Sequence, residues 1–170
     1  MKKTHKNSRW LIVICLLLPI YSQARDLNLE LINAARAGRT AEVRDLIAEG
    51  ADINATNAAG ISVLMMAANF GNARIVDMLL AEGANVNAKD NQESTALIAA
   101  AYTGNLRVLK ALLARGADVN ATNKNGISAL STAKTVGHDE VVSLLEAASE
   151  SNGGNDKSGK AKSKSKSKKK

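Results

Sequence analysis

Apolar residues follow a helical pattern that recurs every 33 residues along most of the chain. Within each recurrence, aliphatic residues lie three or four positions apart, which is the spacing of one buried helix face. A fixed period of this length predicts an array of stacked helical units. The apolar positions are Val43, Leu46 and Ile47; Ile75, Val76, Leu79 and Leu80; Val108, Leu109, Leu112 and Leu113; and Val141, Val142 and Leu145.

Glycine and hydroxyl residues with the same period mark the ends of the helices. Glycine favours the left-handed conformation that ends a helix, and a serine or threonine side chain can cap the start of one. In the second unit these signals predict a first helix over residues 63–70 and a second helix over 73–81. The glycines are Gly38, Gly71, Gly104 and Gly137 in one series and Gly50, Gly83 and Gly116 in another; the capping residues are Ser62, Thr95 and Ser128.

Polar connections and small residues complete each unit. Residues 84–88 (ANVNA), followed by Asp90 and Asn91, predict an extended arm that leads into a turn. Small residues at matching places of the first helices let neighbouring units approach closely. They are Ala34, Ala35, Ala67, Ala68, Ala100, Ala101 and Ala133.

These units resemble the ankyrin repeat, whose consensus runs D-x-x-G-x-T-P-L-H-x-A-A-x-x-G and then I-V-x-x-L-L-x-x-G-A-x-V-N. The matching stretches are NAAGISVLMMAANFGNARIVDMLLAEGANVNA (57–88), DNQESTALIAAAYTGNLRVLKALLARGADVNA (90–121) and NKNGISALSTAKTVGHDEVVSLLEAA (123–148); residues 26–55 match from the first helix onward. The resemblance implies an all-α fold, an α-solenoid of about four ankyrin-type helix-turn-helix repeats with β-hairpin or turn connections. The expected repeats are 25–56, 57–89, 90–122 and 123–150.

Three departures from the ankyrin pattern change local expectations. No unit keeps the Pro or the His of T-P-L-H, and Met65, Ile98 and Ser131 occupy the His place. Glu93 replaces the hairpin glycine found at Gly60 and Gly126, so that turn is either reshaped or strained at Glu93. The last unit has Ser149 where glycine is expected and Glu146 at an otherwise apolar place, as suits a polar terminal cap.

The resemblance also implies where a protein partner would bind. In ankyrin-like arrays the partner meets the hairpin tips and the exposed positions of the first helices, which line one concave face. We expect a monomer that binds through Arg36, Ile61, Asn69, Phe70, Lys89, Asn91, Gln92, Tyr102, Thr103, Lys124, Asn125 and Val136. Further positions of this face are Ala37, Ala58, Ala59, Ser94, Thr122, Ile127 and Thr135.

Two aromatic residues on this face stand out because aromatics make up only 2% of the chain. Trp10 and Tyr21 lie in the N-terminal segment, which leaves Phe70 and Tyr102 in the repeats. Aromatic side chains dominate the energetics of protein interfaces. We interpret both as binding anchors; the alternative is that each fills a gap between neighbouring units.

Charge is distributed unevenly along the chain. The net charge is +7, yet residues 25–150 hold 15 acidic and 11 basic residues, so the repeats are mildly acidic. The basic residues concentrate at the two ends. This distribution argues against a basic fold that recognises a specific nucleic acid.

The first 24 residues are typical of a secretory signal peptide. Basic residues precede an apolar run over 10–20, and the small residues Ser22 and Ala24 predict cleavage between Ala24 and Arg25. The alternative is an uncleaved anchor, although a run this short falls below the roughly 20 residues that span a bilayer. Cleavage removes Cys15, which is the single cysteine, and places an exported, bacterial-type ankyrin repeat protein in the periplasm or outside the cell.

The residues needed for catalysis or metal binding are scarce. After cleavage the chain retains one histidine, His138, and no cysteine, which leaves little material for a zinc site or a nucleophile system. We interpret His138 as a loop residue that hydrogen-bonds between units. The sequence therefore predicts a protein without enzymatic activity and without a cofactor.

The last 20 residues, 151–170, form a polar, lysine-rich tail that is expected to be disordered. This tail either binds anionic lipid or another envelope polyanion or only keeps the chain soluble. The favoured function is an exported adaptor or inhibitor; the alternative is an envelope-associated spacer held by the tail. The candidate polyanion-binding residues are Lys160, Lys162, Lys164, Lys166, Lys168, Lys169 and Lys170.

Overall fold

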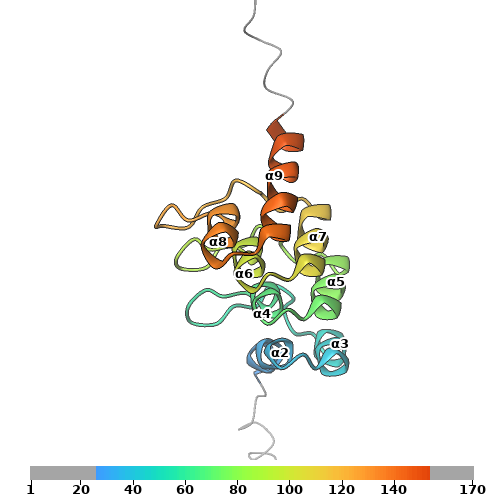
Figure 1. Cartoon of the computed structure of the whole chain (residues 1–170). Coiled ribbons are helices and arrows are strands. Elements are labelled where there is room, and N and C mark those ends of the chain that lie inside the picture. Colours follow the sequence, from blue (N-terminus) through green and yellow to red (C-terminus); the bar gives the residue numbers. More distant parts are fainter. Residues whose placement is uncertain (1–25, 154–170) are drawn as a thin grey trace, which may run out of the picture.

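A computed structural model of the chain describes residues 26–153, which form four stacked helical pairs (Figure 1). The inner row consists of α2 (Leu27–Arg36), α4 (Val63–Asn69), α6 (Ala96–Thr103) and α8 (Ala129–Val136). The outer row consists of α3 (Thr40–Ala48), α5 (Ala73–Ala81), α7 (Leu106–Ala114) and α9 (Asp139–Gly153). Each helix packs on its partner and on the next helix of its own row, as α4 does on α5 and α6. The predicted all-α solenoid is therefore confirmed.

The helices begin and end where local chemistry predicts. Ser62 Oγ accepts a hydrogen bond from the backbone N–H of Met65 at 3.2 Å, and the side chains of Thr95 and Ser128 cap α6 and α8 in the same way. Gly104 ends α6 in the left-handed conformation, with φ at +70°, which a side chain would disfavour. Helix α5 spans 73–81 as expected, and α4 ends one residue before the expected end.

The core lies between the two rows and between successive pairs. Its largest members have less than 2% of their surface exposed, and they include periodic apolar positions of the outer row, such as Val76 and Leu109, and leucines of the inner row, such as Leu64. Alanines pack beside them, which keeps neighbouring helices close: Ala34, Ala67, Ala100 and Ala133 are all fully buried. Because each pair buries its apolar face only against its neighbours, stability depends on the whole stack.

Hydrogen bonds between units follow the same period as the core. The side chains of Asn72 and Asn105 donate to the carbonyl oxygens of Ala35 and Gly71, at 2.7 and 3.1 Å. His138 takes the equivalent place in the last unit, where its Nε2 hydrogen-bonds the carbonyl oxygen of Tyr102 at 3.1 Å. The structural role predicted for His138 is confirmed.

Helix α9 is longer than every other described helix. It spans 15 residues, whereas α3, α5 and α7 each span 9. Ser149 stands where the other units have a helix-ending glycine, so the local signal that stops the helix is missing. The helix therefore continues through Gly153, three residues beyond the domain boundary expected at residue 150. The remainder of the lysine-rich tail and the N-terminal segment through Arg25 lie outside the described residues.

Within 26–153, no helix combines the length and the apolar character needed to cross a membrane.

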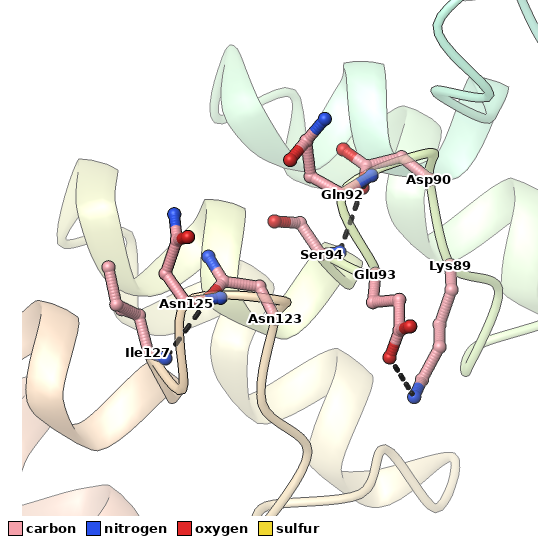
Figure 2. A network of polar contacts seen from close by, with 8 residues as sticks. All are labelled: Lys89, Asp90, Gln92, Glu93, Ser94, Asn123, Asn125 and Ile127. Carbon is pink, nitrogen blue, oxygen red and sulfur yellow. Dashed lines mark hydrogen bonds and ion pairs between the residues drawn. The ribbon is translucent and has the colours of Figure 1, made fainter.

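Glu93 holds a strained backbone in a turn that keeps the shape of its counterpart. Its φ is +61°, close to the +73° of Gly126, and it is the one non-glycine described residue with a positive φ. Asp90 Oδ1 accepts hydrogen bonds from the N–H groups of Gln92 and Ser94, as Asn123 Oδ1 does from the matching groups one unit later (Figure 2). Of the two expectations, the turn is strained rather than reshaped.

We expect Glu93→Gly to raise the free energy of unfolding by up to about 1 kcal/mol, because the left-handed conformation costs a non-glycine residue about that much or more. The change also removes the exposed Lys89–Glu93 ion pair, at 3.7 Å, which contributes little. The matched variant Gly126→Glu should lower it by about 1–2 kcal/mol, since an added Cβ there meets no atom within 4 Å and only the backbone is penalised. Urea unfolding monitored by circular dichroism measures the free energy of unfolding of both variants. A change in the same direction for both variants would contradict backbone strain at Glu93.

Candidate protein-binding face

Three hairpin tips form a connected ribbon along one side of the inner row, at 57–62, 90–95 and 123–128 (Figure 1). Single antiparallel bridges close the first and third tips, Thr56 with Ser62 and Thr122 with Ser128. Neighbouring tips are hydrogen-bonded to each other through the backbone. The Asn91 N–H donates to Ala59 O at 3.0 Å, and the Lys124 N–H donates to Gln92 O at 2.9 Å. The tips are thereby held in fixed register.

A groove runs between the hairpin tips and the inner row; we call it the concave groove. It consists of a hollow of about 190 Å³ between the second and third units and a hollow of about 420 Å³ between the third and fourth. Asn69, Ser94 and Ala99 line both hollows, so the groove is continuous. The smaller hollow is also lined by Ile61, Met65, Met66, Asp90 and Thr95, and the larger by Ile98, Tyr102, Asn123, Ile127, Thr132, Thr135 and Val136.

The concave groove is lined by only part of the set of twelve residues expected to bind a partner, and all twelve are exposed except the half-buried Ile61. Four of them line it: Ile61, Asn69, Tyr102 and Val136. Asn91, Gln92, Lys124 and Asn125 lie at the hairpin tips, and Lys89 precedes the second tip. Arg36, Phe70 and Thr103 lie at the C-terminal ends of α2, α4 and α6.

Large apolar side chains gather at the C-terminal ends of the inner helices and at the third tip. Phe70 and Tyr102 are 53% and 62% exposed, so neither is enclosed between neighbouring units. Ile127 and Val136 are exposed as well, so three of the five exposed large apolar residues of the described chain line the larger hollow, and Phe70 follows the lining residue Asn69. Exposed apolar clusters of this kind mark interaction sites.

The floor of the groove contains residues that the sequence did not single out for binding. Met65 and Ile98, which occupy the place of the ankyrin His, are almost fully buried yet contribute to the lining. Thr132 lines the larger hollow, and its hydroxyl donates to Ser128 O at 2.8 Å. The signal that could have found them is their position one turn into each inner helix, facing the tips.

The described residues offer no cluster for metal chemistry. Within 26–153, no three His, Cys, Asp or Glu side chains lie close enough together to hold a metal ion. The larger hollow is lined by neutral side chains throughout. The surface can therefore contribute apolar contact and hydrogen bonds to a bound molecule.

Comparison with known proteins agrees with this architecture. A family model described as ankyrin repeats (3 copies) matches residues 31–123. No curated protein matches the chain. The fourth helical pair lies outside the matched range, yet Ser128 caps it and Gly137 ends its first helix as in the preceding unit. Ankyrin repeats are generally protein–protein interaction modules. With the match covering more than half of the chain, the protein belongs to the ankyrin repeat family.

Proposed function

We propose that this protein is an exported adaptor or inhibitor that binds another protein through its concave groove. The observation that carries the proposal is the concentration of exposed apolar side chains beside this continuous groove, with Phe70 and Tyr102 both more than half exposed. In the unbound protein these side chains face water, which is unfavourable for apolar surface. A partner that covers them removes this surface from water and gains binding free energy. We expect the protein itself to act as a monomer.

We further propose that the protein is exported, since residues 1–24 have the form of a signal peptide. The small residues Ser22 and Ala24 at the expected cleavage site support it. We expect N-terminal sequencing of the protein recovered outside the cytoplasm to begin at Arg25. A sequence that begins at Met1 in that fraction would contradict cleavage.

Site-specific photo-crosslinking tests the binding face. A benzophenone amino acid replaces either Gln92, at an exposed hairpin tip, or Lys110, on the exposed surface of the outer helix α7. The Gln92 position should cross-link a discrete partner from envelope extracts, and the Lys110 position should not. Cross-linking from Lys110 alone would place the partner on the outer row and refute the proposal.

The second candidate function is an envelope-associated spacer. It is favoured by the tail, where residues 151–170 carry eight lysines and one aspartate. A polycation of this kind is attracted to anionic lipid surfaces. Deletion of residues 154–170, which leaves α9 complete, distinguishes the two candidates. Adaptor activity predicts that envelope retention and partner cross-linking survive the deletion; the spacer function predicts that retention is lost.

A further inference from the structure

The larger hollow of the concave groove has the size of a ligand site and an apolar lining. Its volume of about 420 Å³ lies within the roughly 300–1,000 Å³ of ligand pockets. Ile98, Ile127 and Val136 supply aliphatic surface, and Tyr102 supplies an aromatic ring. Because no lining residue of this hollow carries a charge, it favours a bulky apolar side chain.

Polar groups without a partner lie on both walls of the groove. On the inner-row wall, the Asn69 amide has no hydrogen bond to any described residue, and neither does the Tyr102 hydroxyl. On the opposite wall, the Ser94 hydroxyl is likewise free within the described chain. An extended peptide directs its N–H and C=O groups to both sides, whereas a helix satisfies them internally. The two walls therefore fit an extended segment.

Among the charged side chains at the second and third hairpin tips, one lysine has no ion-pair partner within the described residues. The Lys89 and Glu93 side chains form an ion pair on the side of the tip away from Gln92 (Figure 2). Asp90 uses Oδ1 to accept two N–H groups of its own turn. Lys124 follows the lining residue Asn123, is exposed, and has no side-chain partner among the described residues. A carboxylate beside the groove would pair with it.

We propose that the concave groove binds an extended segment of the partner in which a bulky apolar residue lies next to an aspartate or glutamate. The apolar side chain enters the larger hollow, the backbone hydrogen-bonds to both walls, and the carboxylate pairs with Lys124. This assignment rests on the proposed function and adds the chemistry of the partner. It excludes the lysine-rich tail of the same chain as the occupant, since that tail has no large apolar residue.

The probe is a phage-displayed library of random nonapeptides selected on the immobilised full-length chain. The selected peptides should be enriched in Leu, Ile, Phe or Tyr within two positions of Asp or Glu, and depleted of Lys and Arg. A selected peptide is then measured by fluorescence anisotropy. No enrichment, or enrichment without acidic residues, overturns the proposal.

Three variants connect the selected pattern to the groove. Lys124→Glu should weaken binding of the acidic peptide by about two- to tenfold, because it replaces an exposed charge attraction with a repulsion of similar size. Ile127→Asp should weaken it by about tenfold or more, because it places a charge beside the apolar hollow. Lys110→Glu is the matched control, since Lys110 is exposed on the outer row, and should change nothing. Equal effects of Lys124→Glu and Lys110→Glu overturn the proposal.

The results of these experiments distinguish a failure of the peptide assignment from a failure of the proposed function. If a second copy of the chain occupies the groove, light scattering shows a dimer that Ile127→Asp dissociates, which overturns the peptide assignment. If the library gives the acidic–apolar pattern but the natural partner cross-links only through the outer row, the groove has this peptide preference, yet the proposed function and the assignment of that segment to the partner both fail. If the partner cross-links at Gln92 while the selected peptides lack acidic residues, the proposed function stands and the assignment fails.

Discussion

Leu112→Ala is expected to lower the free energy of unfolding by about 2–5 kcal/mol, the range for a fully buried leucine in a close-packed core. Leu112 is 0% exposed in α7, and α7 packs against α5, α6 and α9. A cavity at this place weakens the contacts of the third unit with both neighbours. Since units are stable only in the stack, the loss should appear in the unfolding of the whole array. Leu79, equally buried one unit earlier, should behave alike.

Leu29→Ala is the matched control for this loss. Leu29 is 52% exposed in the first turn of α2, so the same chemical change should cost less than about 0.5 kcal/mol. Urea unfolding monitored by circular dichroism gives the midpoints of both variants. An unchanged midpoint for Leu112→Ala, or an equal loss for Leu29→Ala, would contradict the stacked-repeat account.

Most of the fold was predictable because its signals are local and repeat. Ser62 caps α4 within one turn, and Gly104 ends α6 by its own backbone conformation, so neither depends on distant residues. The placement of Phe70 and Tyr102 on the concave face came from the resemblance to ankyrin repeats, and Tyr102 does line the larger hollow. Their exposure in the structure agrees with this placement.

Features that depend on competing forces were harder to predict. A turn with Glu93 in place of glycine can keep its hydrogen bonds at the cost of strain or change its shape, and only the structure shows that it keeps them. The sequence predicted no end for α9, because serine stands at residue 149 in place of the glycine that ends the other outer helices. The lining by Met65 and Ile98 was missed because the depth of a groove depends on how neighbouring units pack.

The combined variant Phe70→Ala and Tyr102→Ala is expected to abolish partner binding while leaving the fold largely intact. Both side chains are more than half exposed, so truncation removes little buried surface from the folded chain. An aromatic anchor at the centre of an interface contributes about 2–4 kcal/mol, which corresponds to roughly a 30- to 1,000-fold change in affinity. A variant with Arg74→Ala and Lys110→Ala removes two exposed side chains of the outer row and should bind normally.

The affinity of the Phe70→Ala and Tyr102→Ala variant for the cross-linked partner, measured together with its melting curve, tests the central claim most directly. The account predicts an affinity reduced at least about 30-fold beside a melting temperature within a few degrees of the parent chain. Unchanged affinity would contradict the assignment of the concave groove as the binding face. A strongly lowered melting temperature, with binding lost only through unfolding, would instead show that the two aromatic side chains stabilise the stack.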